Sequence, residues 1–142
     1  PPGTSDEHIT ISNYLKNTHI DGAIVITTPQ EVACIDVRRE LNFCKKVGIP
    51  VIGIVENMSG FVCPKCKTQT AIFKSSGQGK GGEGLSKLFN VPLLGKLPLD
   101  PMVMQACESG KSILKEAPQS PASRALFEIV EKVKSIVSTA NK

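Results

Sequence analysis

The central apolar run of the chain reads Val51-Ile52-Gly53-Ile54-Val55, and Glu56-Asn57 follow it directly. A short run without charged or polar side chains is typical of a strand that is buried on both faces of a parallel sheet. Two further runs share this character, Ala23-Ile24-Val25-Ile26 and the segment 92–97. Helical patterns alternate with the three runs. The sequence therefore predicts an α/β fold with a parallel sheet and helices on both faces, a three-layer α/β/α arrangement.

Helix boundaries are marked between these runs. Thr28-Pro29-Gln30-Glu31 predicts a helix start with the threonine as cap, proline in the first position and glutamate reaching back to the cap amide. Gly48 ends this predicted helix before the next strand. The pairs Asp100-Pro101 and Ser120-Pro121 repeat the capping pattern, which predicts a short helix and then a long final one.

Length and composition indicate one compact unit. The 142 residues suit a single domain, 40% of them are apolar, and aromatic residues make up only 4%. The net charge of +4 is too small to predict nucleic-acid binding, and no apolar run approaches the roughly 18 residues of a membrane span. Three strands form a thin sheet, and Pro1-Pro2-Gly3-Thr4 is typical of a turn after a strand. We therefore expect residues 1–142 to be the C-terminal part of a larger α/β domain.

The five cysteines fall into two groups. Cys34, Cys44 and Cys107 stand alone in predicted helices, where small core residues are common. Cys63-Pro64-Lys65-Cys66 follows a strand and a turn and does not open a helix, as a thioredoxin-like redox pair requires. This spacing instead favours a metal knuckle, in which two sulfurs bind one ion. An odd cysteine count without a signal-peptide pattern indicates a reducing compartment and a cytoplasmic protein.

Two thiolates are half of a usual metal site. Sites built from thiolates generally have four ligands, and the sequence contains no second pair at this spacing. One hypothesis is that a second copy of the chain supplies the other two across a two-fold axis. The other is that the pair binds no metal. Four thiolates accept either zinc or an iron–sulfur cluster, and the residues alone leave that choice open.

A glycine-rich stretch occupies residues 77–84 and contains the letters of a dinucleotide-binding motif. Its context does not fit, because no convincing strand precedes it and no lysine occupies the position that a phosphate loop needs. We expect a flexible loop here, and an insert over residues 58–84 that carries both the cysteine knuckle and this loop. Asn57 and Asp100 come after predicted parallel strands, where open α/β sheets bind ligands, although Asp100 also fits the role of a helix cap.

Five separated motifs resemble one family, the Mrp-like deviant P-loop ATPases, and in particular the eukaryotic cytosolic iron–sulfur cluster assembly factors. They are Pro1-Pro2-Gly3-Thr4-Ser5-Asp6-Glu7-His8, Thr27-Thr28-Pro29-Gln30-Glu31-Val32, Glu56-Asn57-Met58-Ser59-Gly60-Phe61, Cys63-Pro64-Lys65-Cys66 and Pro98-Leu99-Asp100-Pro101. The resemblance extends over essentially the whole chain, in order and with matching spacing. It implies the C-terminal part of a P-loop NTPase domain.

The resemblance implies an ATP-dependent scaffold that assembles [4Fe-4S] clusters and transfers them to cytosolic and nuclear apoproteins. Cys63 and Cys66 match the cysteines that hold a cluster between two subunits, with zinc as a substitute. Asn57, Pro98 and Asp100 match residues that border the nucleotide base. The implied partners are a second copy of the chain, or a paralogous scaffold ATPase in a heterotetramer, together with recipient apoproteins. ATP and Mg²⁺ are the implied cofactors, and neither nucleic acid nor a membrane is implied.

Family members place their P-loop and an Mg²⁺-associated aspartate ahead of the motifs quoted above. Residues 1–142 contain neither, so we assign no catalytic residue and expect these residues alone not to hydrolyse ATP. We also expect Ile9, Ile11 and Leu15 to form an exposed apolar stripe. A non-catalytic dimerisation module with a shared structural zinc is the alternative function. A partition-type ATPase acting on a membrane or DNA is disfavoured, because that class has no use for Cys-Pro-x-Cys.

Overall fold

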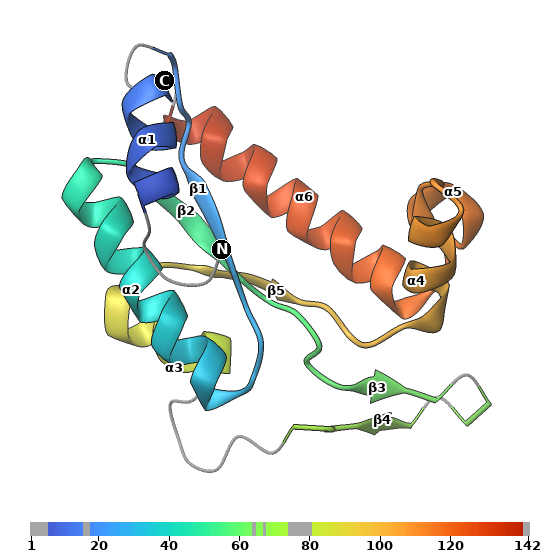
Figure 1. Cartoon of the computed structure of the whole chain (residues 1–142). Coiled ribbons are helices and arrows are strands. Elements are labelled where there is room, and N and C mark those ends of the chain that lie inside the picture. Colours follow the sequence, from blue (N-terminus) through green and yellow to red (C-terminus); the bar gives the residue numbers. More distant parts are fainter. Residues whose placement is uncertain (1–5, 16–17, 64, 67, 74–80, 141–142) are drawn as a thin grey trace.

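A three-stranded parallel sheet forms the centre of the molecule, in a computed structural model that describes residues 6–15, 18–63, 65–66, 68–73 and 81–140 (Figure 1). Its strands are β1 (Ala23–Thr27), β2 (Val51–Glu56) and β5 (Leu93–Lys96), in the order β1-β2-β5. Both strand pairs are parallel. The predicted α/β class and the three predicted strands are therefore confirmed.

Helices cover both faces of this sheet. α2 (Glu31–Val47) and α3 (Gly81–Phe89) pack on one face, and α6 (Pro121–Ala140) crosses the other (Figure 1). The N-terminal helix α1 (Asp6–Leu15) lies beside α2, and the ring centroids of His8 and Phe43 are 5.9 Å apart. The predicted three layers are thus present.

The remaining elements lie beyond the carboxyl end of the sheet. The short strands β3 (Phe61–Val62) and β4 (Gln69–Thr70) form an antiparallel hairpin that projects away from the layers (Figure 1). Two short helices, α4 (Pro101–Glu108) and α5 (Ile113–Glu116), connect β5 to α6. The turn expected at residues 1–4 lies outside the described residues.

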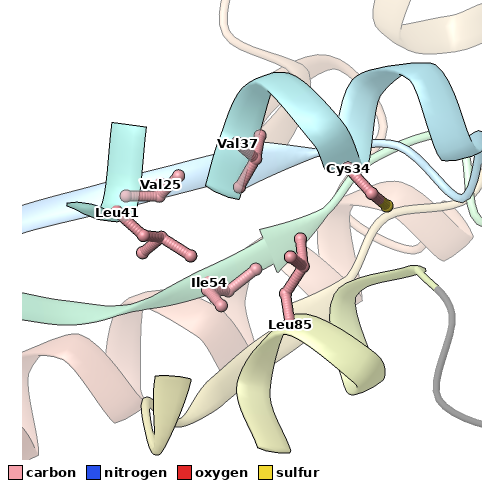
Figure 2. Packing of buried hydrophobic residues seen from close by; sticks show 6 residues of the cluster. All are labelled: Val25, Cys34, Val37, Leu41, Ile54 and Leu85. Carbon is pink, nitrogen blue, oxygen red and sulfur yellow. The ribbon is translucent and has the colours of Figure 1, made fainter. Parts of the chain in front are cut away.

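The core has two parts, because β2 directs alternate side chains to opposite faces. Ile54 is fully buried against α2 and α3, in a cluster that Figure 2 shows. Its members are Val25, Cys34, Val37, Leu41, Ile54 and Leu85. The next residue, Val55, packs with Leu94 and Ile129 beneath α6. β2 is therefore buried on both faces, which is why its sequence is apolar from Val51 to Val55.

The predicted cap of α2 is wrong. The N-cap residue is Gln30, and no side chain caps the first turn. The Thr28 hydroxyl instead donates a hydrogen bond to the Gln30 side-chain oxygen at 3.0 Å, so it is committed outside the helix. The other predicted boundaries are confirmed: Gly48 ends α2 with φ +77°, and Ser120 Oγ accepts a hydrogen bond from Ser123 N–H at the start of α6.

The end of the glycine-rich stretch is helical, and the expectation of a loop up to residue 84 is wrong there. α3 begins at Gly81, whereas residues 77–80 lie outside the described residues. Glu56 explains the helix start, because its carboxylate accepts a hydrogen bond from the Gly82 N–H at 2.7 Å. A carboxylate at this position satisfies an unpaired amide and favours the positive end of a helix.

The expected exposure of apolar residues on the first helix is confirmed. Ile9, Ile11 and Leu15 are 48%, 55% and 39% exposed. Ile24 and Ile26 of β1 are exposed as well. No helix in the described part of the chain has both the length and the apolar character needed to cross a bilayer.

Candidate metal centre at the carboxyl edge of the sheet

The residues singled out by sequence gather at one edge of the sheet. β2 ends at Glu56 and β5 ends at Lys96, and these two residues are paired across the strands. Asn57 therefore follows one strand where the segment Pro98–Asp100 follows its neighbour. Since the carboxyl ends of parallel strands form the usual ligand-binding edge of such folds, the arrangement brings the predicted site residues to one place.

The hairpin carries both cysteines of the Cys-Pro-x-Cys motif. Phe61 pairs with Thr70 and Val62 with Gln69, and the Cys63 N–H donates to the Thr68 carbonyl at 3.0 Å. The cysteines thus lie in the connection between two antiparallel strands and not at the start of a helix. This local structure fits a metal knuckle and lacks the feature that a thioredoxin-like pair needs. Pro64 lies outside the described residues.

The two thiols differ in exposure, and neither forms a disulfide. Cys63 is half-buried and Cys66 is exposed. The Cys66 sulfur is hydrogen-bonded to the Thr68 hydroxyl at 3.3 Å. Bonds from the Thr68 side chain, then the Thr68 backbone, and then the Cys63 thiol lower the pKa of Cys66 to about 7. A thiolate is the form that binds metals, so these contacts prepare Cys66 as a ligand near neutral pH.

This pKa predicts how the metal-free protein reacts with alkylating agents. Because the thiolate is the nucleophile, we expect alkylation of Cys66 by iodoacetamide to rise with pH through a midpoint near 7. Thr68→Val removes the hydroxyl, raises the Cys66 pKa and shifts the midpoint to higher pH. Thr68→Ser keeps the hydroxyl and serves as the matched control. Peptide mass spectrometry at a series of pH values measures the rate, and an unshifted midpoint in Thr68→Val contradicts the assigned cause.

The hairpin presents two sulfur ligands and no complete site. Across the described residues, no three histidine, cysteine, aspartate or glutamate side chains are grouped closely enough to hold a metal. Paired thiolates are soft ligands, which suit zinc and iron–sulfur clusters, and such centres are usually held by four of them. The residues therefore fit one half of a four-thiolate centre.

Asn57 and Pro98 both lie near Ser59 and Gly60, the residues at the base of the hairpin. The Asn57 N–H donates to the Thr27 carbonyl at 2.7 Å, and its exposed side chain accepts a bond from the Met58 N–H at 2.9 Å. Pro98 lies between two residues that bond to the hairpin base: the Leu97 carbonyl accepts from Ser59 N–H at 2.9 Å, and the Leu99 N–H donates to the Gly60 carbonyl at 2.7 Å. Asn57 and Pro98, which were predicted to border the nucleotide base, therefore both adjoin the segment that leads to Cys63.

Asp100 caps two helices. Its Oδ1 accepts a hydrogen bond from Met102 N–H at 3.0 Å at the start of α4, which confirms the capping prediction. Its Oδ2 accepts a longer bond, 3.4 Å, from Ala122 N–H at the start of α6. The same carboxylate borders a cavity of about 260 Å³ between the hairpin and these helix ends. The lining residues are Phe61, Val62, Cys63, Leu99, Asp100, Pro101, Met102, Ser120 and Pro121.

Sequence reasoning missed Glu56 and its partners. Glu56 is only 5% exposed; besides Gly82, its carboxylate lies 3.9 Å from the Lys96 ammonium. Lys96 in turn bonds Glu83 at 2.7 Å, a contact that lowers the pKa of Glu83. A buried carboxylate requires such partners. The available signal was a charged residue at the end of an otherwise apolar strand.

The fold is that of P-loop NTPases of the MinD type. Structures with this fold include a cell division ATPase MinD from Pyrococcus furiosus (TM-score 0.61, 22% identity, 82% of this chain and 43% of that chain) and a MinC:MinD complex from Aquifex aeolicus (0.65, 14%, 93% and 47%). A nucleotide-binding protein from Archaeoglobus fulgidus, solved in complex with ADP, matches with TM-score 0.57 and 25% identity over 70% of this chain and 40% of that chain.

Within this fold class, residues 1–134 match the family model described as ParA: NUBPL iron-transfer P-loop NTPase, and the chain belongs to that family. A relative from Kluyveromyces lactis, the cytosolic Fe-S cluster assembly factor NBP35, is 55% identical over 137 residues, which cover 96% of this chain. The chain spans 41% of the length of that relative.

Proposed function

We propose that this chain is part of an ATP-dependent scaffold that assembles [4Fe-4S] clusters in the cytosol and transfers them to apoproteins. The observation that carries the proposal is the hairpin with Cys63 and Cys66, which presents two thiols and no further ligand among the described residues. Membership of an iron-transfer family and the 55% identity to a cytosolic Fe-S cluster assembly factor support it.

A second subunit completes the centre in this proposal. Two copies related by a two-fold axis place identical residues face to face, so two hairpins supply four thiolates. A paralogous scaffold subunit with the same hairpin serves equally well, and two copies of each subunit then form a heterotetramer. The exposure of Cys66 supports this arrangement, because its sulfur is accessible to a partner. The cluster is the cargo of the scaffold, and recipient apoproteins take it up.

Asn57, Pro98 and Asp100 border the base of a bound nucleotide in this proposal. They follow the ends of two neighbouring strands at the carboxyl edge of the sheet, and the Archaeoglobus fulgidus protein with this fold was solved with ADP. ATP hydrolysis supplies the energy for the cycle, with Mg²⁺ as the cofactor that neutralises the phosphate charge. The segment 97–99 is hydrogen-bonded to residues 59 and 60 at the start of the hairpin. The segment proposed to border the nucleotide base and the segment that carries the cysteines are therefore adjacent in the fold.

A structural zinc shared between two subunits is the second candidate. The two-thiolate knuckle favours it as well, because zinc is commonly held by four thiolates. In that case the protein is a dimerisation module, and its metal takes no part in a transfer reaction.

Anaerobic reconstitution separates these two functions. We expect the purified protein, incubated with iron and sulfide, to bind four irons and four sulfides per two chains and to absorb broadly at about 400 nm. Zinc at one ion per two chains, with no visible absorption and no uptake of iron and sulfide, contradicts the scaffold and supports the dimerisation module.

A further inference from the structure

The Asp100 carboxylate joins the N-terminal ends of two helices. Its two oxygens accept from Met102 N–H in α4 and from Ala122 N–H in α6, 22 residues further along the chain. Figure 1 shows the starts of α4 and α6 meeting on the side of the molecule from which the hairpin projects. The amides at a helix N-terminus carry a partial positive charge, and here one negative group offsets two such ends.

The same carboxylate lies in the wall of the cavity that Cys63 also lines. The distance between them is fixed by backbone pairing, because Phe61 of the hairpin forms a parallel bridge with Leu99, the residue before Asp100. The Leu99 N–H bond to the Gly60 carbonyl, 2.7 Å, closes the same contact. Asp100 and Cys63 are therefore held at the walls of one small cavity by the connections of their own backbones.

The charge of this cavity depends on Asp100. Of the described residues that line it, Asp100 is the only one that carries a full charge; the others are apolar, small or hydroxyl-bearing, apart from the Cys63 thiol. A metal centre held by four thiolates is anionic, and reduction adds one more negative charge. A carboxylate across the cavity opposes that added charge, whereas the two helix ends favour it. The Asp100 carboxylate and the two helix ends thus border the same cavity as Cys63.

We propose that Asp100 is a positioning residue of the cysteine site, which holds the starts of α4 and α6 at the cavity beside Cys63 and sets the charge there. This inference rests on the proposed function, because it concerns the cluster that the cysteines bind. It adds to the role of residues 98–100 beside the nucleotide base: the carboxylate is directed to the helix ends and the cavity. Asp100 then disfavours reduction of the bound cluster and keeps it in the oxidised state.

The test is a redox titration of the reconstituted protein with dithionite, followed by visible absorption. Asp100→Asn removes the charge and keeps one oxygen that can cap α4, whereas its amide nitrogen cannot accept the longer bond from Ala122 N–H. We expect this variant to take up the cluster and to have a more positive reduction potential than the wild type. Chelator-driven loss of the anionic cluster is expected to slow by about threefold or more, since one opposing charge across a short distance is removed. Glu108→Gln, which removes a carboxylate at the far end of the same helix, is the matched control and leaves both quantities unchanged.

A second variant keeps the test decisive if Asp100→Asn fails to fold. Asp100→Ser also removes the charge and retains a capping oxygen, so it is expected to shift the potential in the same direction. A cluster-loaded, folded Asp100→Asn or Asp100→Ser protein with the wild-type potential overturns the inference and leaves the proposed function intact. Failure of the wild type to bind any cluster contradicts the proposed function, and this inference with it.

Discussion

Cys63→Ala and Cys66→Ala are each expected to abolish binding of the bridging cluster and to leave the fold intact. In the proposed site each chain contributes two of the four thiolates, so either change leaves a two-fold-related pair of chains with only two. The hairpin projects from the layers, and neither sulfur belongs to the two core clusters beneath the helices. The loss is therefore confined to the metal site.

Iron and sulfide analysis after anaerobic reconstitution measures this effect, and circular dichroism with thermal unfolding checks the fold. Cys107→Ala is the matched control, because Cys107 is an exposed cysteine on α4 that lies outside the hairpin. We expect this control to bind as much cluster as the wild type. A full cluster content in either hairpin variant would contradict the shared site.

Gly81→Ala is expected to produce the largest loss of stability, about 2–4 kcal/mol in the free energy of unfolding. A methyl group at this position would lie 2.5 Å from Glu56 Oε2, and the residue has φ +68°. The strained conformation and the collision act together. The contact also cannot relax freely, because the same oxygen accepts the bond from Gly82 N–H that begins α3.

A matched control separates these two causes. Gly110 has φ +62°, and no atom lies within 4 Å of the place that an added methyl group would take. Gly110→Ala therefore has the strain without the collision and is expected to cost about 1 kcal/mol.

Urea unfolding of both variants, and of Glu56→Ala with and without Gly81→Ala, completes the comparison. Glu56→Ala removes the colliding oxygen, so we expect the two changes to cost less together than the sum of their separate costs. Equal losses for Gly81→Ala and Gly110→Ala would refute the close contact.

The sheet was predictable from sequence because burial on both faces leaves an unmistakable run of apolar residues, as at Val51–Val55. The cap of α2 was not, because the Thr28 hydroxyl has a competing acceptor in the Gln30 side chain. The start of α3 was not predicted either, for a different reason. Its stabilising group, Glu56, lies 26 residues earlier in the chain than the Gly82 amide, and no local pattern around Gly81 reveals it.

In the candidate site too, some features follow from the local sequence and others depend on contacts between distant residues. The spacing of Cys63 and Cys66 predicted a pair of metal ligands, which stays a prediction, and the residue before Pro101 predicted a helix cap, which is confirmed. The bond from Asp100 to the start of α6 depends on a contact across 22 residues, and the cavity shared with Cys63 depends on the pairing of Phe61 with Leu99. The lowered pKa of Cys66 likewise depends on how the hairpin places Thr68. Local chemistry was therefore predictable, whereas contacts made by tertiary packing were not.

Native mass spectrometry of the anaerobically reconstituted protein shows whether two chains share one cluster through their hairpin cysteines. We predict one species with two chains and a single [4Fe-4S] cluster, and we expect Cys63→Ala to remove this species. A cluster bound to a single chain, or an unchanged cluster-bearing dimer in Cys63→Ala, would contradict the shared site.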